Sequence, residues 1–293
     1  MHSKRNYRGV LGMALMLAAA GIMTLPQASA KTLEWGGCGI TKKAFMFALA
    51  DAFEDRTGTK IEIHGGGATH GIRGTASGEI HMGGACRPRM AGNPAEDVRM
   101  VHVAWDALVA IVHPSNPVDN LTGDELRQIF RGEITNWKEL GGPDKFIVVG
   151  YRSAPLSGVG YSFRELGFRE ETGPGDFTSG VGQKSSGPLE LAVEQLPNAF
   201  AITGVSSARK RDVKIIGIDG IEPSPENIAS GEYPFYRPLY LTVPDDPAPA
   251  VERFVEFALS DEGQRIIREE ETVNLEMGKT LDNPWSGNTF SQD

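Results

Sequence analysis

Short apolar runs with strand character alternate with amphipathic helical segments, and this alternation constrains the fold more than any other feature of the sequence. We expect strands at 32–35, 60–64, 79–83 and 101–113, and helices at 42–57 and 72–76. The first helix places Phe45, Leu49, Ala52 and Phe53 on one face and ends at Gly58. A strand–helix–strand rhythm favours parallel pairing, so we predict an α/β protein whose parallel sheet carries helices on both faces.

Glycine-rich turns follow three of these strands, at 36–41, 65–71 and 83–87. In an open α/β sheet, ligands bind at the edge formed by the carboxyl ends of the strands. Farther along, Arg152 follows another strand, and Ser157 and Gly158 open a helix. Helix N-termini, hydroxyl groups and guanidinium groups all donate hydrogen bonds to small oxyanions. Each turn alone is compatible with plain chain reversal, so the prediction of an anion site depends on their combination.

The first thirty residues have the layout of a secretory signal peptide. Lys4, Arg5 and Arg8 precede an apolar stretch at 10–25, and a small-residue cleavage sequence ends at Ala30. No later run reaches the ~20 apolar residues that a membrane span needs. We therefore expect residues 1–30 to be removed and the protein to be exported, most simply into a bacterial periplasm.

Net charge and missing motifs narrow the possible functions. The formal net charge of −9 argues against general nucleic-acid binding, which requires a basic surface. The sequence lacks C-x-x-C, H-E-x-x-H and G-x-S-x-G motifs, so we do not expect an enzyme. No cofactor is expected either.

Several segments together resemble the phosphate-binding-protein family of ABC transporters. The most specific is "LTGDELRQIFRGEITNWKELGG"; "WDALVAIVHPSNPV", "IHGGGATHGI" and "LSDEGQRII" fit the same family. The resemblance implies a two-lobed periplasmic binding protein fold of type II, with a ligand cleft between the lobes. It places one lobe at 31–104 and 238–293 and the other at 105–237.

The same resemblance implies which residues hold the ligand. Arg87, Arg152, Ser157 and Gly158 match the family pattern. Other positions depart from it: Cys38 and Cys86 stand where the family has serine, Val159 stands where threonine is usual, and His70 lies in a turn where small residues are usual. The expected ligand-binding set is Cys38, Gly39, Ile40, Thr41, Thr69, His70, Cys86, Arg87, Arg152, Ser157, Gly158 and Val159.

The two cysteines leave several interpretations open. A thiol is a poor hydrogen-bond donor, so serine-to-cysteine changes would weaken the binding of phosphate. Thiolates favour soft centres, so Cys38 and Cys86, with His70 as a possible third ligand, could hold trivalent arsenic or a soft metal ion. In an oxidising compartment they could instead form a disulfide. They could also be inert, with phosphate or another tetrahedral oxyanion as the ligand and His70 a polar loop residue.

We therefore expect a periplasmic solute-binding protein that captures a small inorganic oxyanion, and the cysteines favour a thiophilic, arsenite-like one. The alternative is an ordinary phosphate- or arsenate-binding protein for ABC uptake, or a ligand-binding sensor subunit for a histidine kinase. The expected partners are the anion and either the membrane permease of an ABC transporter or a sensor kinase. We expect the protein itself to be a monomer.

Overall fold

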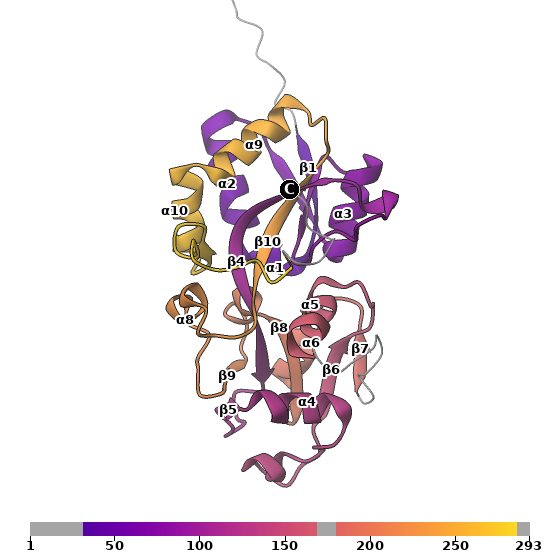
Figure 1. Ribbon diagram of the computed structural model, residues 1–293, viewed down its shortest axis with the longest axis vertical. Coiled ribbons are helices and arrows are strands. Elements are labelled where there is room, and N and C mark those ends of the chain that lie inside the picture. Colours follow the sequence, from indigo (N-terminus) through magenta and orange to yellow (C-terminus); the bar gives the residue numbers. More distant parts are fainter. Residues whose placement is uncertain (1–31, 169–179, 286–293) are drawn as a thin grey trace, which may run out of the picture.

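The computed structural model describes residues 32–168 and 180–285. The predicted signal peptide, residues 1–30, lies outside them. Within the described residues, no helix is both long and apolar enough to span a bilayer. The elements form two lobes stacked along the long axis of the molecule (Figure 1).

Lobe 1 contains both ends of the described chain. Its strands are β1 (Leu33–Gly37), β2 (Ile61–His64), β3 (Met82–Ala85) and β11 (Val273–Asn274). Its helical elements are α1 (Gly39–Thr41), η1 (Lys42–Met46), α2 (Phe47–Thr57), α3 (Gly67–Ser77), η2 (Pro94–Glu96), α9 (Pro249–Leu259) and α10 (Asp261–Glu269). Helices α2, α9 and α10 lie on one side of the strands and α3 lies on the other (Figure 1).

Lobe 2 is formed by the middle of the chain. Its strands are β5 (Asn120–Leu121), β6 (Val148–Arg152), β7 (Val181–Gln183), β8 (Ala199–Gly204) and β9 (Lys214–Ile218). Its helical elements are α4 (Gly123–Arg131), η3 (Trp137–Leu140), α5 (Gly158–Gly167), α6 (Ser186–Gln195), α7 (Val205–Ala208) and α8 (Pro225–Ser230). The start of α4 follows directly from sequence: Thr122 accepts from the Glu125 N–H, and the Glu125 carboxylate accepts from the Thr122 N–H at 2.8 Å, which is a capping box.

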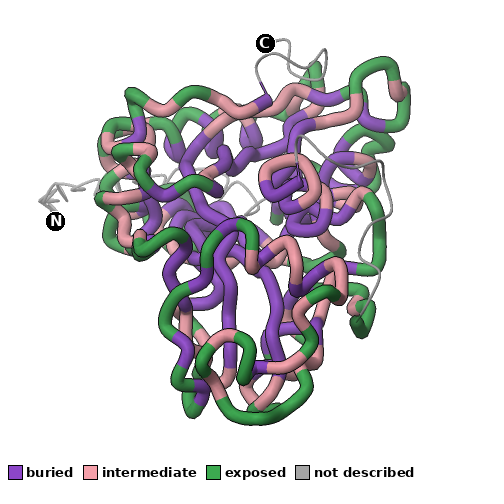
Figure 2. The backbone as a smooth tube through the Cα atoms, turned by 60° about the horizontal axis from the view of Figure 1, so that its bottom comes forward, coloured by how far each residue is buried: buried purple, intermediate pink, exposed green. Residues whose placement is uncertain are grey.

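Two long strands, β4 (Arg99–Val112) and β10 (Tyr236–Val243), join the lobes. The main path of the sheet runs β2-β1-β3-β10-β4-β8-β6-β7. The first part of β4 pairs with β10, whereas its last five residues, from Leu108, pair with β8. The backbone is buried along these central strands and exposed mainly at the loops (Figure 2).

The prediction of a parallel sheet is correct for β1 with β2 and β3 and for β6 with β7 and β8, but wrong for the two strands that cross between the lobes. Strand β1 pairs in parallel with β2 and β3, and β6 pairs in parallel with β7 and β8. Strand β10 is antiparallel to β3 and β4, and β4 is antiparallel to β8. The chain crosses to lobe 2 along β4 and returns along β10, so these two strands must run in opposite directions.

The glycine-rich stretch at 65–71, predicted as a loop before a short helix, is mostly helix. Helix α3 begins at Gly67 rather than near residue 72. Its glycine face packs directly on the glycines of β3: a Cβ atom on Gly71 would lie 2.6 Å from the Gly84 carbonyl oxygen. The glycines in this segment therefore allow close packing of a helix on a sheet, which the local sequence pattern does not distinguish from a turn.

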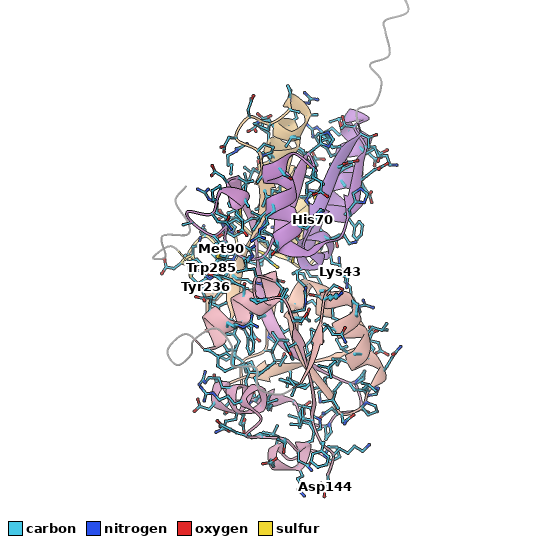
Figure 3. All side chains as sticks on the ribbon, turned by 90° about the vertical axis from the view of Figure 1, so that its right-hand side faces the viewer. Lys43, His70, Met90, Asp144, Tyr236 and Trp285 are labelled. Carbon is cyan, nitrogen blue, oxygen red and sulfur yellow. The ribbon has the colours of Figure 1, made fainter. Side chains whose placement is uncertain are left out.

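Direct contacts hold the lobes together beside the crossing strands. The Lys43 ammonium, from lobe 1, donates to the Glu190 carboxylate at 3.1 Å and to the Ser207 hydroxyl at 2.9 Å, both in lobe 2. Lys43 lies at the level where the two lobes meet (Figure 3). We call this boundary, where residues of lobe 1 contact residues of lobe 2, the seam. On another part of the seam, the Thr69 hydroxyl of lobe 1 donates to the Leu156 carbonyl of lobe 2 at 2.8 Å.

Candidate functional site

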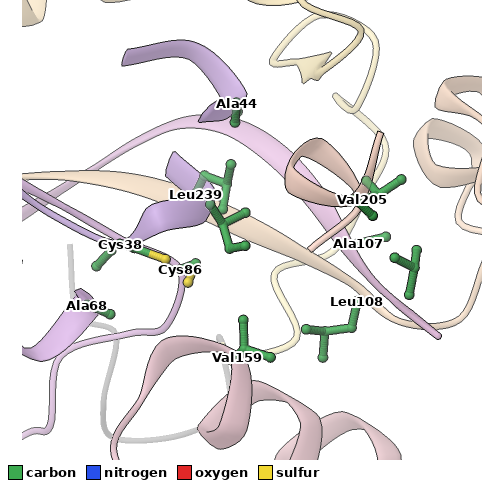
Figure 4. Close-up of a cluster of buried hydrophobic side chains, with 14 of the residues drawn as sticks. Cys38, Ala44, Ala68, Cys86, Ala107, Leu108, Val159, Val205 and Leu239 are labelled. Atoms are coloured by element: carbon green, nitrogen blue, oxygen red, sulfur yellow. The ribbon is translucent and has the colours of Figure 1, made fainter. Parts of the chain in front are cut away.

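The candidate site lies on the seam, where the turns after β1 and β3 meet the N-terminus of α5. Cys38 follows β1 and donates its backbone N–H to the Gly84 carbonyl at 2.9 Å, which brings the two turns together. Cys86 follows β3, and a Cβ atom added to Gly158 of α5 would lie 2.3 Å from its Sγ atom. The two cysteine sulfurs lie beside each other, with Ala68 and Val159 nearby (Figure 4). Both cysteines are buried, free thiols.

The surroundings of Cys38 stabilise negative charge. Burial raises the pKa of this thiol. A hydrogen bond with Cys86, the positive charge of Arg237 and the backbone N–H groups of Ile40 and Thr41 outweigh burial and lower the pKa to about 7. The pKa of Cys86 is raised by burial, and its hydrogen bond to Cys38 and the neighbouring thiolate charge raise it further. As pH rises through the neutral range, Cys38 therefore ionises before Cys86.

Lobe 2 contributes Arg152, Ser157, Gly158 and Val159. Arg152 ends β6 and is only 8 % exposed; it donates to the Ser186 hydroxyl at 3.1 Å and to the Gln183 carbonyl at 3.2 Å. Burial lowers the pKa of Arg152, and the negative charges of the two cysteines oppose that effect. This guanidinium group therefore lies within electrostatic reach of both sulfurs.

The helix start at Ser157 forms as its sequence predicts. The Ser157 hydroxyl accepts a hydrogen bond from the Gly160 N–H at 3.2 Å and so caps α5. Val159 is buried in the first turn of the helix. Gly39, in the first turn of α1, has no atom close to its Cβ position.

Arg87, which the resemblance places in the ligand set, is fully engaged by the protein. Its guanidinium group makes five hydrogen bonds: two to the Glu96 carboxylate at 2.8 and 3.0 Å, and one each to the Pro88 carbonyl, the Leu156 carbonyl and the Thr69 hydroxyl. A guanidinium group has five N–H donors. The geometry therefore gives Arg87 a structural role, in which it joins its own loop to lobe 2.

His70 and Thr41 do not point their polar groups at the thiols. The His70 ring lies within lobe 1 against Gly36 and Gly66 (Figure 3). The Thr41 hydroxyl donates to the Cys38 carbonyl at 2.9 Å. Over the described part of the chain, no group of three or more His, Cys, Asp or Glu side chains could hold a metal ion. The possible soft-metal site of Cys38, Cys86 and His70 is therefore not assembled in this arrangement of the described residues, in which the His70 ring packs against Gly36 and Gly66.

The main residue that sequence reasoning missed is Arg237, on β10. It is fully buried and donates to the Cys86 carbonyl at 3.2 Å, to the Gly158 carbonyl at 3.3 Å and to the Asp106 carboxylate at 3.2 Å. Within the described residues its Nε atom is buried without a hydrogen-bond partner. Arg237 and Asp106 each interrupt an otherwise apolar strand run, "YRPLYLTV" and "VAWDALVAIV". The signal that could have identified this pair was a single charged residue in each apolar strand, because a buried charge needs a partner of opposite charge.

Comparison with known proteins places these features in a family. A family model described as the PBP superfamily domain matches residues 36–262. The phosphate-binding protein PstS of Bacillus subtilis is 27% identical over 225 residues, which covers 76% of this chain and 73% of the relative. Protein SphX of Synechococcus elongatus is 25% identical over 281 residues, covering 88% and 82% of the two chains.

Solved structures agree with the sequence relatives. A Clostridium perfringens protein, assigned as a phosphate ABC transporter substrate-binding protein and solved with bound phosphate, superposes with a TM-score of 0.75 at 29% identity, covering 83% of this chain and 99% of that one. An ABC-type phosphate transport receptor from Vibrio cholerae superposes with a TM-score of 0.62 at 26% identity, covering 83% and 100%. The expected periplasmic binding protein fold is thereby confirmed.

Proposed function

The chain belongs to the PBP superfamily, and on that premise we propose that it is the solute-binding subunit of an ABC uptake system for phosphate or a related tetrahedral oxyanion. One observation carries this proposal: the N–H groups of Ile40 and Thr41, at a helix start, and the buried Arg237 guanidinium, whose Nε atom has no partner among the described residues, all act on Cys38 at the seam. A thiolate is itself an anion. The groups that stabilise it, two backbone N–H groups at a helix start and the Arg237 guanidinium, also stabilise a bound oxyanion.

We propose that capture proceeds by closure of the two lobes over the anion. Lobe 1 would contribute the N–H groups of Ile40 and Thr41, and lobe 2 would contribute Arg152 and the start of α5 at Ser157. The lobe boundaries that we propose, after residues 104 and 237, fall inside β4 and β10, the two strands that cross between the lobes. Bending of those strands would open and close the site.

The remaining parts of the proposal concern location and partners. Export with removal of residues 1–30 would place the protein where a membrane permease can collect its ligand. The Bacillus subtilis relative is named as a phosphate-binding protein, and the Vibrio cholerae neighbour is named as an ABC-type phosphate transport receptor. We therefore propose binding rather than catalysis, a permease rather than a sensor kinase as the partner, and a monomer as the working form.

A thiophilic ligand such as arsenite is a second candidate, favoured by one observation: the two thiols are hydrogen-bonded to each other. Two sulfurs without a third ligand offer a soft ion less than a complete site. The Bacillus subtilis relative is named as a phosphate-binding protein and the Clostridium perfringens neighbour was solved with bound phosphate, which favours the oxyanion over arsenite. The arsenite interpretation that the cysteines favoured in the sequence is therefore the weaker of the two.

The test is thermal unfolding of the processed protein with phosphate, arsenate, sulfate or arsenite, each with and without a thiol reductant. A ligand of the native state raises the melting temperature by mass action. We expect phosphate and arsenate to raise it in the wild type and in Arg265→Gln, which changes an exposed arginine on α10. We expect the shift to be lost in Arg152→Gln. A shift with arsenite alone, only under reducing conditions and lost in Cys38→Ser, would replace the oxyanion with the thiophilic ligand.

A further inference from the structure

Cys38 and Cys86 lie in contact at the ends of neighbouring strands, and oxyanion capture requires sulfur at neither position. Strands β1 and β3 pair in parallel with Gly37 opposite Gly84, so Cys38 comes one residue and Cys86 two residues after that pair. The thiols are hydrogen-bonded to each other and both are free. Their sulfur atoms lie beside each other (Figure 4), as a disulfide between them requires.

We infer that Cys38 and Cys86 form a redox-active dithiol that reacts with small disulfides, and that its oxidation tightens oxyanion binding at the same seam. The second half of this inference rests on the proposed function; the first half does not.

Cys38 is the attacking group. The N–H groups of Ile40 and Thr41 and the charge of Arg237 favour its thiolate, and a pKa of about 7 makes a large share of this group a nucleophilic thiolate at neutral pH. The Cys38 thiolate attacks one sulfur of the external disulfide, forms a mixed disulfide and expels the other half as a thiolate. Cys86 then loses its proton to that thiolate, and its sulfur attacks Cys38 and expels the second half. Two protein thiols are oxidised by two electrons, and one external disulfide is reduced to two thiols.

Access to the dithiol depends on the lobes. Gly158 covers Cys86 from lobe 2, and the Ser162 hydroxyl of the same helix donates to the Cys86 carbonyl at 2.9 Å. Both thiols are buried in the closed arrangement. An external disulfide must therefore enter while the lobes are apart, and an anion that holds them closed slows the reaction.

Oxidation changes the charge that a bound anion meets. In the reduced protein, the Cys38 thiolate takes the N–H groups of Ile40 and Thr41 and part of the field of Arg237. A disulfide carries no charge, so it returns those donors to the ligand and removes a repulsive charge from a buried site. We expect phosphate to bind about tenfold tighter to the oxidised form, which corresponds to one interaction worth about 1.4 kcal/mol.

The experiment exposes the processed wild-type protein to oxidised glutathione, followed by acid quench, alkylation of remaining thiols and intact-mass measurement. We expect the wild type to lose two hydrogen atoms and carry no glutathione. Cys86→Ser should stop at a stable glutathione adduct on Cys38, whereas Cys38→Ser should react much more slowly. Circular dichroism and the melting temperature of each variant show whether it is folded. Two alkylatable thiols persisting in the folded wild type, or adducts on both cysteines, would overturn the dithiol.

Phosphate titrations of the reduced and oxidised proteins separate the two halves of the inference. Slower oxidation in saturating phosphate and a lower dissociation constant after oxidation support the coupling. An unchanged or higher dissociation constant refutes it. If the disulfide forms but phosphate binds neither form, the proposed function fails and the redox chemistry stands. If phosphate binds and the thiols do not react, the redox chemistry fails and the proposed function stands.

Discussion

Arg87 and Arg237 are both fully buried and both paired with a buried carboxylate, yet the protein uses them differently. Arg87 makes five hydrogen bonds to protein acceptors, including two to Glu96. The guanidinium of Arg237 lies where its charge acts on both seam thiols, and its Nε atom has no partner among the described residues. A buried arginine with a charged partner is therefore not by itself a ligand residue. What distinguishes the two is the uncommitted Nε donor of Arg237 and the action of its charge on both thiols.

The largest effect that follows from this comparison concerns stability. Arg87→Met should lower the free energy of unfolding by about 3 kcal/mol, because the buried Glu96 carboxylate loses both Arg87 hydrogen bonds and keeps only the half-exposed Arg73 and the Met90 N–H as partners. Urea denaturation measures the change. Oxyanion affinity, expressed per folded molecule, should change much less than stability does.

The matched control is the double variant Arg87→Met with Glu96→Gln. It removes the buried carboxylate charge that only Arg73 still neutralises, and it should recover a large part of the lost stability. If Arg87→Met kept its stability and lost phosphate binding instead, Arg87 would be a ligand residue and the contrast with Arg237 would collapse.

Sequence patterns were sufficient for features that depend on short stretches of chain. The helix ending at Gly58 adopts the left-handed cap that glycine allows, with φ of 69°. The capping box at Thr122 and the cap at Ser157 also form as expected. Each of these depends on contacts within a few residues, which the sequence displays directly.

The features that sequence patterns missed depend on pairs that are distant in the chain. Arg237 and Asp106 are 131 positions apart and meet only because β4 and β10 pair. The five bonds of Arg87 likewise require Leu156, which lies in the other lobe. A local pattern can show that a charge stands in an apolar strand, but only the three-dimensional pairing shows which donors are already used.

The second prediction tests the other side of the comparison. Arg237→Met should weaken phosphate binding by about 10- to 100-fold, the loss expected for charge-assisted hydrogen bonds of about 1.5–3 kcal/mol. It should also raise the pKa of Cys38, because a positive charge that favours the thiolate is gone. Calorimetric titration gives the affinity, and the pH dependence of thiol alkylation gives the pKa.

Arg237→Lys is the control for this variant. Because lysine keeps a positive charge, the pKa of Cys38 should stay nearly as low as in the wild type. The anion should bind less tightly than it does with arginine. Unchanged affinity and an unchanged thiol pKa in Arg237→Met would show that Arg237 is as purely structural as Arg87.

The third prediction concerns pH. Folding lowers the pKa of Cys38 from its ordinary value of 9.0 to about 7. The resulting stabilisation is fully present above about pH 9 and is lost as the pH falls through about 7. Reduced protein should gain about 1 kcal/mol between about pH 7 and about pH 8 relative to Cys38→Ser. The neighbouring charges are those of Cys86, Arg237, Asp106 and Arg152. Above about pH 9 the raised pKa of Cys86 opposes the gain. Parallel slopes for the two proteins would contradict a thiolate at Cys38.

The smallest effect is expected at Lys43. Like Arg87, it binds a buried carboxylate; like Arg237, it lies where the two lobes meet. Its ammonium group binds Glu190 across the seam, but it is partly exposed, and Glu190 also accepts from Arg211 at 3.1 Å and from the Thr203 and Ser207 hydroxyls at 2.6 Å. Removing Lys43 therefore leaves Glu190 with an arginine and two hydroxyl groups as partners, whereas removing Arg87 takes two hydrogen bonds from the Glu96 carboxylate at once.

Lys43→Met should consequently lose no more than about 1 kcal/mol of interaction free energy. We expect this loss to destabilise the closed arrangement of the lobes rather than to lower the free energy of unfolding. We expect phosphate affinity to fall by up to about fivefold while the urea midpoint of ligand-free protein stays nearly constant. Small-angle scattering should show a more open average shape at subsaturating phosphate. Lys60→Met, which removes an exposed lysine of lobe 1 distant from the seam, should alter neither quantity. A large loss of stability in Lys43→Met would instead place Lys43 beside Arg87, as a charge that the fold itself requires.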